Sequence, residues 1–245
     1  MTKLYEANNH ILIRAGYDNP VLHRHMAAHI IISIGGEMCI TSGEVEYLCH
    51  GVVIPSGIPH KVNTYGNAAL VFLYDCTTDV AKQIQDIQCI SKELCNHIAE
   101  WYTTFEQDCT ADTYGRFENN LLTQLGLVGS SMHAVRDERI LSAMKYIRSK
   151  FSERISCQDV ADAVHLSQGR LSHLFKEQVG MTFAAYLIYQ RIMYVYAQTF
   201  RGKSITEAAL GAGFSSSAHF ADANRRVFGI SASSIAHNLI FVKVQ

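Results

Sequence analysis

Several features that would assign the chain to a particular class of protein are missing from its 245 residues. Its longest apolar runs fall far short of the roughly 20 residues that a transmembrane helix needs. No charged and then apolar N-terminal segment precedes a small-residue cleavage site, so we expect no signal peptide. The seven cysteines are scattered, without a CxxC pair, which suits a reducing compartment better than a disulfide framework. These absences predict a cytoplasmic protein with no membrane partner.

The net charge of −1 conceals an uneven distribution of charge along the chain. Residues 1–132 contain 7 Lys and Arg against 14 Asp and Glu, whereas residues 133–245 contain 14 against 8. Two interpretations stay open at this point. Either the basic C-terminal half alone binds a polyanion, or two domains have ordinary surfaces of different charge.

Residues 9–76 have the pattern of a β domain. Short β-branched or apolar runs are separated by Gly, Asn and Pro, namely "HILIRAG", "HIIISIGG", "MCITSG", "VEYLCHG" and "ALVFLYD". Short strands at this spacing are typical of a sandwich or a barrel. We therefore assign a first domain to residues 1–78.

From Thr78 onward the periodicity changes to that of amphipathic helices. Apolar side chains recur every three or four positions at Val80, Ile84, Ile87, Leu94, Ile98, Trp101, Tyr102, Phe105, Phe117, Leu121, Leu122 and Leu125. These helices, in residues 79–128, either pack on their own β domain or form a dimer interface. The small and partly polar residues 129–135 are interpreted as a linker.

From Arg136 the chain is predicted to be wholly helical, and this part contains an internal repeat. "SCQDVADAVHLSQGRLSHLFKEQVGMT" begins at Ser156, and "SITEAALGAGFSSSAHFADANRRVFGIS" begins at Ser204. Each copy starts with a serine followed three residues later by an acid, the pattern of a capping box. Each ends with a glycine, Gly180 or Gly229, suited to closing a helix. The pattern indicates two helix-turn-helix units joined by one long helix at about 183–199.

The repeat resembles the AraC-type transcription regulators over residues 140–237. The resemblance implies two helix-turn-helix units on a rigid linker helix, which read successive major-groove segments on one face of double-stranded DNA. Many members of this family also carry an N-terminal cupin-like barrel that senses a small molecule, followed by helices that dimerise. We therefore expect an α+β chain with a cupin-like barrel in 1–78, a dimerisation segment in 79–128, a linker in 129–135 and a double helix-turn-helix domain in 136–245. The implied function is sequence-specific binding of promoter or operator DNA by a homodimer, controlled by a small molecule or a metal.

The resemblance also implies which side chains meet DNA. In the first reading helix, 167–179, the candidates are Gln168, Gly169, Arg170, Ser172 and His173 toward the bases and Lys176 toward phosphate. In the second, 216–227, they are Ser217, Ala218, His219, Ala221 and Asp222, with Arg225 and Arg226 toward the backbone. Arginine can bind guanine through two hydrogen bonds, and serine and histidine can reach base edges.

The second unit departs from the family pattern at several positions. Asp222 stands where a basic or amide residue is usual, and Asn224 occupies an aromatic position. Ala232 replaces a common proline, and Gln198 and Thr199 occupy normally apolar positions of the linker helix. A carboxylate in the groove repels phosphate, although it can accept a hydrogen bond from cytosine. The second unit is therefore predicted to be the weaker reader.

Four histidines form the candidate effector site of the N-terminal domain. "HRHMAAH" supplies His23, His25 and His29, and "GVVIPSGIPHKVN" supplies His60, and these segments resemble the two cupin motifs. Three uses remain open: a divalent metal such as Zn²⁺, a metal-free effector pocket, or a purely structural cluster.

A cupin-type metalloenzyme with a helical appendage is the alternative function. His29 stands where a non-haem iron site would have a carboxylate, however, and no spaced acid-base pair occurs elsewhere. The third hypothesis is a DNA-binding protein whose barrel is only a dimer scaffold. We expect no enzyme.

Overall fold

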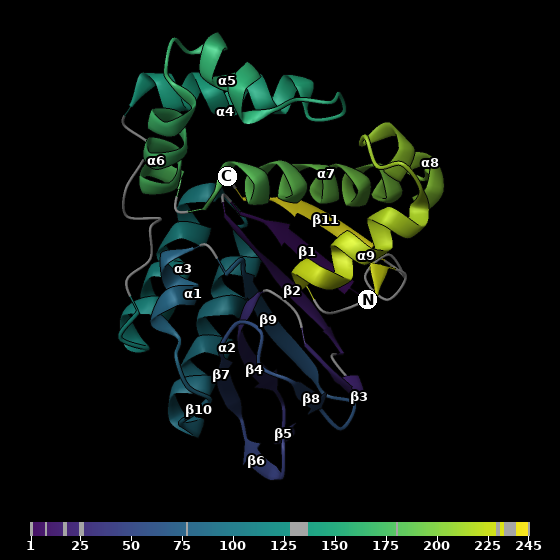
Figure 1. The fold of residues 1–245 in the computed structure, drawn as a ribbon. Helices are drawn as coiled ribbons and strands as arrows, with labels where there is room; N and C mark the ends of the chain where they lie inside the picture. The colour runs from purple at the N-terminus through teal and green to yellow at the C-terminus, as the bar shows by residue number, and fades with distance from the viewer. Residues whose placement is uncertain are drawn as a thin grey trace.

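The structure is a computed structural model that describes residues 2–7, 9–16, 19–24, 27–76, 78–127, 137–179, 181–228, 231–232 and 239–244. Two β-sheets occupy the N-terminal half, and a set of helices from the C-terminal half lies against one end of them (Figure 1). None of the helices in these ranges is long and apolar enough to cross a membrane.

The larger sheet has seven strands in the order β10-β7-β4-β9-β2-β1-β11. Its members are β1 (Thr2–Glu6), β2 (His10–Gly16), β4 (Ala28–Ile34), β7 (Gly51–Ile54), β9 (Ala68–Tyr74), β10 (Gln88–Ile90) and β11 (Leu239–Lys243). The smaller sheet has four strands in the order β3-β8-β5-β6: β3 (Asn19–His23), β8 (His60–Asn63), β5 (Met38–Ser42) and β6 (Val45–Cys49). Every neighbouring pair is antiparallel except β1 with β11.

The seven-stranded sheet is buried on both of its faces. Ile31 and Val52 share one core cluster with Ile40 and Val62 of the small sheet. The neighbouring residues of the large sheet, which point the other way, belong to a second cluster with two helices, α2 (Lys92–Gln107) and α3 (Ala111–Gln124). A short helix, α1 (Asp79–Gln83), precedes β10. The molecule therefore layers a small sheet, a large sheet and helices.

The expected cupin-like barrel is not confirmed. The strands among the described residues form two separate sheets, with no closed barrel. Alternating apolar residues predict a buried strand face, but they do not distinguish a closed sheet from two packed ones. The mixed α+β organisation, with the sheets first and the helices last, agrees with the expectation from the sequence.

The C-terminal half contains six helices in the described ranges. They are α4 (Glu138–Lys150), α5 (Cys157–Ala163), α6 (Gln168–Val179), α7 (Phe183–Phe200), α8 (Ile205–Gly211) and α9 (Ser217–Phe228). The pairs α5–α6 and α8–α9 are the two copies of the repeat, and α7 joins them. The predicted linker, 129–135, lies outside the described residues, as do Gly180 and Gly229.

The expectation of a wholly helical chain after Arg136 is wrong at its end. Leu239–Lys243 forms β11, which pairs in parallel with β1 at the edge of the large sheet (Figure 1). The Val244 N–H donates to the Glu6 carbonyl at 3.0 Å, and Lys243 Nζ lies 3.3 Å from Glu6 Oε2. A five-residue apolar run gives no periodicity that separates strand from helix, so only the free edge of β1 decides its conformation.

Candidate nucleic-acid interface and effector sites

The first helix-turn-helix unit is built by local hydrogen bonds that its sequence predicts. Ser156 Oγ accepts from the Asp159 N–H at 3.2 Å, and the Asp159 carboxylate accepts from the Ser156 N–H at 2.7 Å, so a full capping box starts α5. His165 takes a left-handed conformation with φ of 55° in the turn that follows. Ser167 Oγ then accepts from the Arg170 N–H at 3.3 Å at the start of α6. These bonds fix the direction of α6 relative to α5.

The amphipathic division of α6 separates its core face from its candidate reading face. Leu171, Leu174 and Phe175 are buried, with Phe175 packed edge-on against Tyr186 of α7. The face left in solvent carries all the candidates implied by the resemblance: Gln168, Gly169, Arg170, Ser172, His173 and Lys176. The structure therefore brings these six residues together on one exposed surface.

The second unit repeats the arrangement of the first, with fewer polar candidates on its exposed face. Ser204 Oγ accepts from the Glu207 N–H at 3.2 Å to start α8, and Ser216 Oγ accepts from the His219 N–H at 3.0 Å in the first turn of α9. The exposed positions of α9 are Ala218, His219, Asp222, Arg225 and Arg226, whereas Ser217 and Ala221 are half-buried. His219 Nδ1 accepts from the Ser215 N–H at 3.3 Å, so its other ring nitrogen carries the proton and remains a donor.

Asn224 is a structural residue of the second unit. It is fully buried, and its Oδ1 accepts from the Tyr196 hydroxyl of α7 at 2.6 Å. The departure from an aromatic residue is therefore compensated by a buried side-chain hydrogen bond between α9 and the linker helix.

Helix α7 connects the two units and is fixed at both ends. Near its start, α6 packs beside it, and near its end α8 and α9 pack beside it (Figure 1). Arg191 Nε donates to the Phe151 carbonyl at 2.7 Å, and Arg191 Nη2 donates to the Glu153 carbonyl at 2.9 Å. The pKa of Arg191 is lowered because the guanidinium is half-buried. These contacts hold the two units at a fixed relative orientation.

Three of the predicted histidines meet between the two sheets. The ring centroids of His23 and His60 are 4.5 Å apart, and those of His29 and His60 are 5.1 Å apart. The Nδ1–H of His60 donates to the Ile58 carbonyl at 2.8 Å. In the neutral ring, Nε2 is then the unprotonated nitrogen and acts as an acceptor. Burial lowers the pKa of His60 to about 4, so the ring is neutral near pH 7. His25 lies outside the described residues.

The described residues do not supply a metal centre. No group of three or more His, Cys, Asp or Glu side chains within those ranges is arranged to hold a metal ion. The rings of His23, His29 and His60 instead form a compact cluster of imidazole nitrogens.

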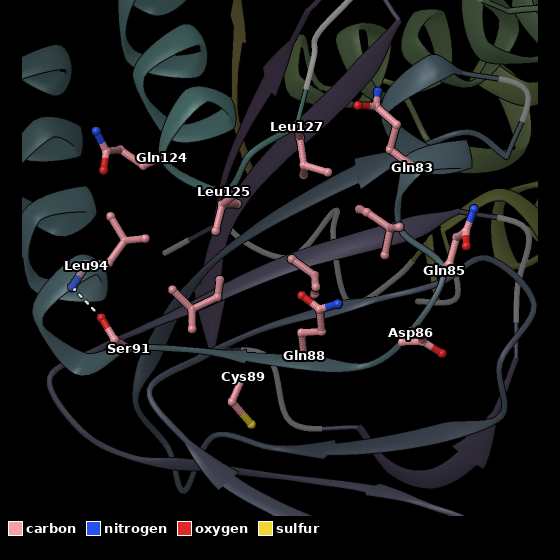
Figure 2. Close-up of a pocket in the computed structure, with 13 residues that line it drawn as sticks. Gln83, Gln85, Asp86, Gln88, Cys89, Ser91, Leu94, Gln124, Leu125 and Leu127 are labelled. Carbon is pink, nitrogen blue, oxygen red and sulfur yellow. Dashed lines mark hydrogen bonds between the residues drawn. The ribbon is translucent and has the colours of Figure 1, made fainter.

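A pocket that the sequence did not predict opens at the other side of the large sheet. Its volume is about 290 Å³, and Figure 2 shows it between the α1–β10 segment, the start of α2 and the end of α3. Apolar side chains come from Val53, Ile84, Ile90, Leu94, Leu125 and Leu127, and amides come from Gln83, Gln85, Gln88 and Gln124. Asp86, Cys89 and Ser91 complete the lining, which includes no histidine. The only trace in the sequence is the glutamine-rich segment 83–88.

The two halves of the chain are joined by a buried hydroxyl that sequence reasoning also missed. The Tyr189 hydroxyl of α7 lies 2.6 Å from the Ala7 carbonyl and 2.7 Å from the His10 carbonyl. The His10 ring in turn lies 2.6 Å from the Tyr114 hydroxyl of α3 and is stacked on Tyr74. The linker helix therefore contacts the β1–β2 connection, which contacts the helical layer.

Comparison with known proteins relates the C-terminal half to helix-turn-helix domains. Residues 160–238 match a family model described as "Helix-turn-helix domain". The "Arabinose operon regulatory protein" of Salmonella typhimurium is 34% identical over 76 residues, which cover 31% of this chain and 27% of that protein. An uncharacterised HTH-type transcriptional regulator of Staphylococcus aureus is 32% identical over 93 residues, covering 38% of this chain and 12% of that protein. This chain thus spans about a quarter and about an eighth of the lengths of these relatives.

The fold as a whole has a counterpart among solved structures. ToxT from Vibrio cholerae O395 superposes with a TM-score of 0.52 at 12% identity, covering 94% of this chain and 96% of that chain. At this identity the likeness concerns the fold alone. It extends across both halves, including the sheets that the helix-turn-helix model does not cover.

Proposed function

We propose that this chain, whose residues 160–238 belong to the AraC-type helix-turn-helix family, is a sequence-specific transcription regulator that binds double-stranded DNA. The observation that carries the proposal is the pair of helix-turn-helix units held at the two ends of α7, each presenting an exposed polar face. Reading helices fixed in this way address successive major-groove segments, about 34 Å apart on one face of the duplex. The named relatives are transcription regulators, and nothing among them supports the enzyme alternative.

The first unit is the main reader in this proposal. Arg170 can bind guanine through two hydrogen bonds, and Lys176, six residues further along α6, reaches the phosphate backbone. On α9, Asp222 adds an exposed negative charge within one turn of Arg225 and Arg226, which weakens the attraction of that helix to DNA, although its carboxylate can accept a hydrogen bond from cytosine. The full set of proposed DNA contacts is Gln168, Gly169, Arg170, Ser172, His173, Lys176, Ser217, Ala218, His219, Ala221, Asp222, Arg225 and Arg226.

The proposal is tested with sites selected from random DNA by the full chain. Arg170→Ala should cost about 1–3 kcal/mol of binding free energy and relax the preference at one base pair. Lys176→Ala should weaken all sequences equally and reduce the salt slope by about one unit. Lys82→Ala, an exposed cation on α1, is the matched control and should change neither quantity. Equal affinity for selected and scrambled DNA across the salt series would refute the proposal of sequence-specific binding.

We further propose that the N-terminal half binds an effector in a metal-free pocket. A fold of this kind can hold a small molecule, since one ToxT structure is described as bound to an unsaturated fatty acid. The candidates that we compare are the cluster of His23, His29 and His60 and the pocket of Figure 2. The pocket is the stronger candidate, because Leu125 and Leu127 precede the segment 128–136 that leads to the DNA-binding half.

Single substitutions distinguish the two candidate effector sites. Leu94→Trp should fill the pocket and abolish the thermal shift given by an effector found in a metabolite screen, whereas His60→Asn should not. The reverse result would assign the effector to the histidine cluster. Metal content after gentle purification, measured beside a His25→Ala, His60→Ala double variant, tests the divalent ion separately. Stoichiometric metal that the double variant loses would contradict the metal-free pocket.

Homodimerisation through residues 79–128 remains a proposal. The apolar stripe that suggested it is largely used within the chain, since Ile98 and Phe105 are buried against the large sheet, while Leu94 and Trp101 are partly exposed. Two copies would place two pairs of reading helices on a repeated site. Sedimentation of the full chain at tens of micromolar should show a dimer, and Trp101→Glu should convert it to a monomer.

A further inference from the structure

Two cysteines far apart in the sequence meet where the two sheets approach each other. Cys49 ends β6 of the small sheet, and Cys89 is the middle residue of β10 at the edge of the large sheet. Residue Cys89 pairs with Val52 of β7, only three residues after Cys49, and β10 also contacts β6 directly. The chain turn at His50 thus brings both thiols to the same corner.

The strand pattern directs the Cys89 side chain toward Cys49. Its neighbour Ile90 faces the helices, where its Cβ lies 3.2 Å from the position that a Cβ on Gly51 would take. Side chains alternate along a strand, so Cys89 points to the opposite face, the face of Val52 and the inter-sheet core that contains Cys49. Figure 2 shows the Cys89 sulfur on the opposite side of β10 from Gln88. The Cys89 thiol lies near enough to Cys49 to contribute to the raised pKa of the Cys49 thiol.

The two thiols differ in their access to solvent. Cys89 is exposed, whereas Cys49 is buried with 6% of its surface accessible. Burial, reinforced by the Cys89 contact, raises the pKa of Cys49 to about 12 and keeps it a neutral thiol near pH 7. A third thiol, Cys95, is buried on the helix face of the sheet, against Gly51. An oxidant from solvent therefore reaches Cys89 first, and Cys49 is the thiol beside it.

We propose that Cys49 and Cys89 form a reversible redox site that is oxidised to a disulfide by hydroperoxides. In the first step the Cys89 thiol is oxidised by hydrogen peroxide to a sulfenic acid, and one water is released. In the second step the Cys49 sulfur attacks the Cys89 sulfur, the S–O bond breaks, and the Cys49 proton leaves with the hydroxide as a second water. Two thiols and one peroxide thus give one disulfide and two waters. A dithiol reductant reverses the reaction by thiol–disulfide exchange.

This modification site is independent of the proposed DNA contacts. The disulfide would link the corner of the small sheet to β10, which forms one wall of the pocket in Figure 2. Because Cys89 itself belongs to the lining of that pocket, the disulfide would restrain the pocket wall formed by β10.

The test counts thiols in the full chain. The reduced protein has seven cysteines, and limited hydrogen peroxide followed by alkylation of the remaining thiols should leave five reactive. Peptide mapping without reduction should recover one cross-linked pair containing Cys49 and Cys89, and dithiothreitol should restore all seven. Cys89→Ser, at an exposed position, should abolish the cross-link without disturbing the fold. Cys109→Ser, an exposed cysteine between α2 and α3, is the matched control and should leave the cross-link intact.

Three results would overturn the proposal. One is a chain that retains seven alkylatable thiols at peroxide concentrations that oxidise free cysteine. Another is a Cys89–Cys89 bond between two copies, seen as a non-reduced dimer on a denaturing gel. The last is an unchanged cross-link yield in Cys89→Ser. In Cys49→Ala the proposal expects Cys89 to stop at the sulfenic acid, trapped by dimedone, and a disulfide with any other cysteine would contradict the assigned pairing.

Discussion

His10 shows how a buried side chain makes stability depend on pH. It is fully buried among Tyr74, Tyr114 and Glu118, and burial lowers its pKa, an effect that the nearby Glu118 carboxylate partly offsets. The unfolded chain, with an ordinary histidine pKa near 6.5, therefore binds a proton more readily than the folded chain does. The contribution of His10 is fully present above that value and declines as the pH falls below it.

We predict that His10→Gln will reduce the pH dependence of folding. Between pH 6.5 and pH 5 the wild-type free energy of unfolding should fall more steeply than that of the variant, by up to about 1.4 kcal/mol per pH unit. Urea unfolding at several pH values measures the slope. His97→Gln, on the exposed side of α2, is the control and should keep the wild-type slope. Parallel slopes for wild type and His10→Gln would show that the ring is not the responsible group.

Individual contacts such as these were only partly predictable. The exposed positions of α6 follow from helical periodicity, because Leu171, Leu174 and Phe175 could only face the core. The bond between Tyr196 and Asn224 could not be derived, since it joins two helices whose separation is fixed by tertiary packing. The resemblance to the cupin motifs predicted one site for the three histidines, although His23 and His29 come from strands of different sheets. The pocket of Figure 2 depends instead on how the α1–β10 segment packs against α2 and the end of α3.

The starts of the helices test how far an element is encoded locally. Both repeats place an acid three residues after a capping serine, but only in the first does the carboxylate bond back to the serine N–H. That hydrogen bond lowers the pKa of Asp159. Both acids have the same favourable position relative to the helix dipole, so the difference between them isolates the return bond of the capping box.

We predict that Asp159→Ala will destabilise the chain more than Glu207→Ala does. The excess should appear as a lower denaturant midpoint for Asp159→Ala than for Glu207→Ala, because only Asp159 accepts the return hydrogen bond from its capping serine. Chemical denaturation at pH 7 provides the comparison, and lowering the pH well below 4 should remove the difference, because the carboxylate is then protonated. Equal losses in the two variants would mean that the return bond adds nothing to α5.

At the level of elements, helices were read from the sequence better than the last strand. Helix-capping residues and the spacing of the two repeats predicted a linker helix at about 183–199, and α7 spans Phe183–Phe200. Residues Leu239–Lys243 were expected to be helical, but the unpaired edge of β1 provides partners that no local signal contains. The same limit applies to closure: strand patterns predicted the sheets and not whether they close.

At the level of the whole molecule, the two halves are connected through β1, β2 and α7. The C-terminal strand extends the N-terminal sheet, and the Tyr189 hydroxyl bridges two carbonyls of the β1–β2 connection. The linker helix is therefore anchored to the half that is proposed to bind an effector. A change in that connection would move the helix that carries both helix-turn-helix units.

We predict that Tyr189→Phe will weaken this anchor while leaving each half folded. The variant leaves the Ala7 and His10 carbonyls without their shared donor, at a cost of about 1–3 kcal/mol. Hydrogen exchange should accelerate in the β1–β2 connection and along α7, and remain unchanged in β4 and β9 at the centre of the sheet. Tyr194→Phe, on the same helix with its ring against Phe151, is the control and should leave exchange in the β1–β2 connection unaltered. If Tyr189→Phe exchanges like wild type in both segments, the hydroxyl does not couple the halves, and communication between them must run through the pairing of β11 with β1.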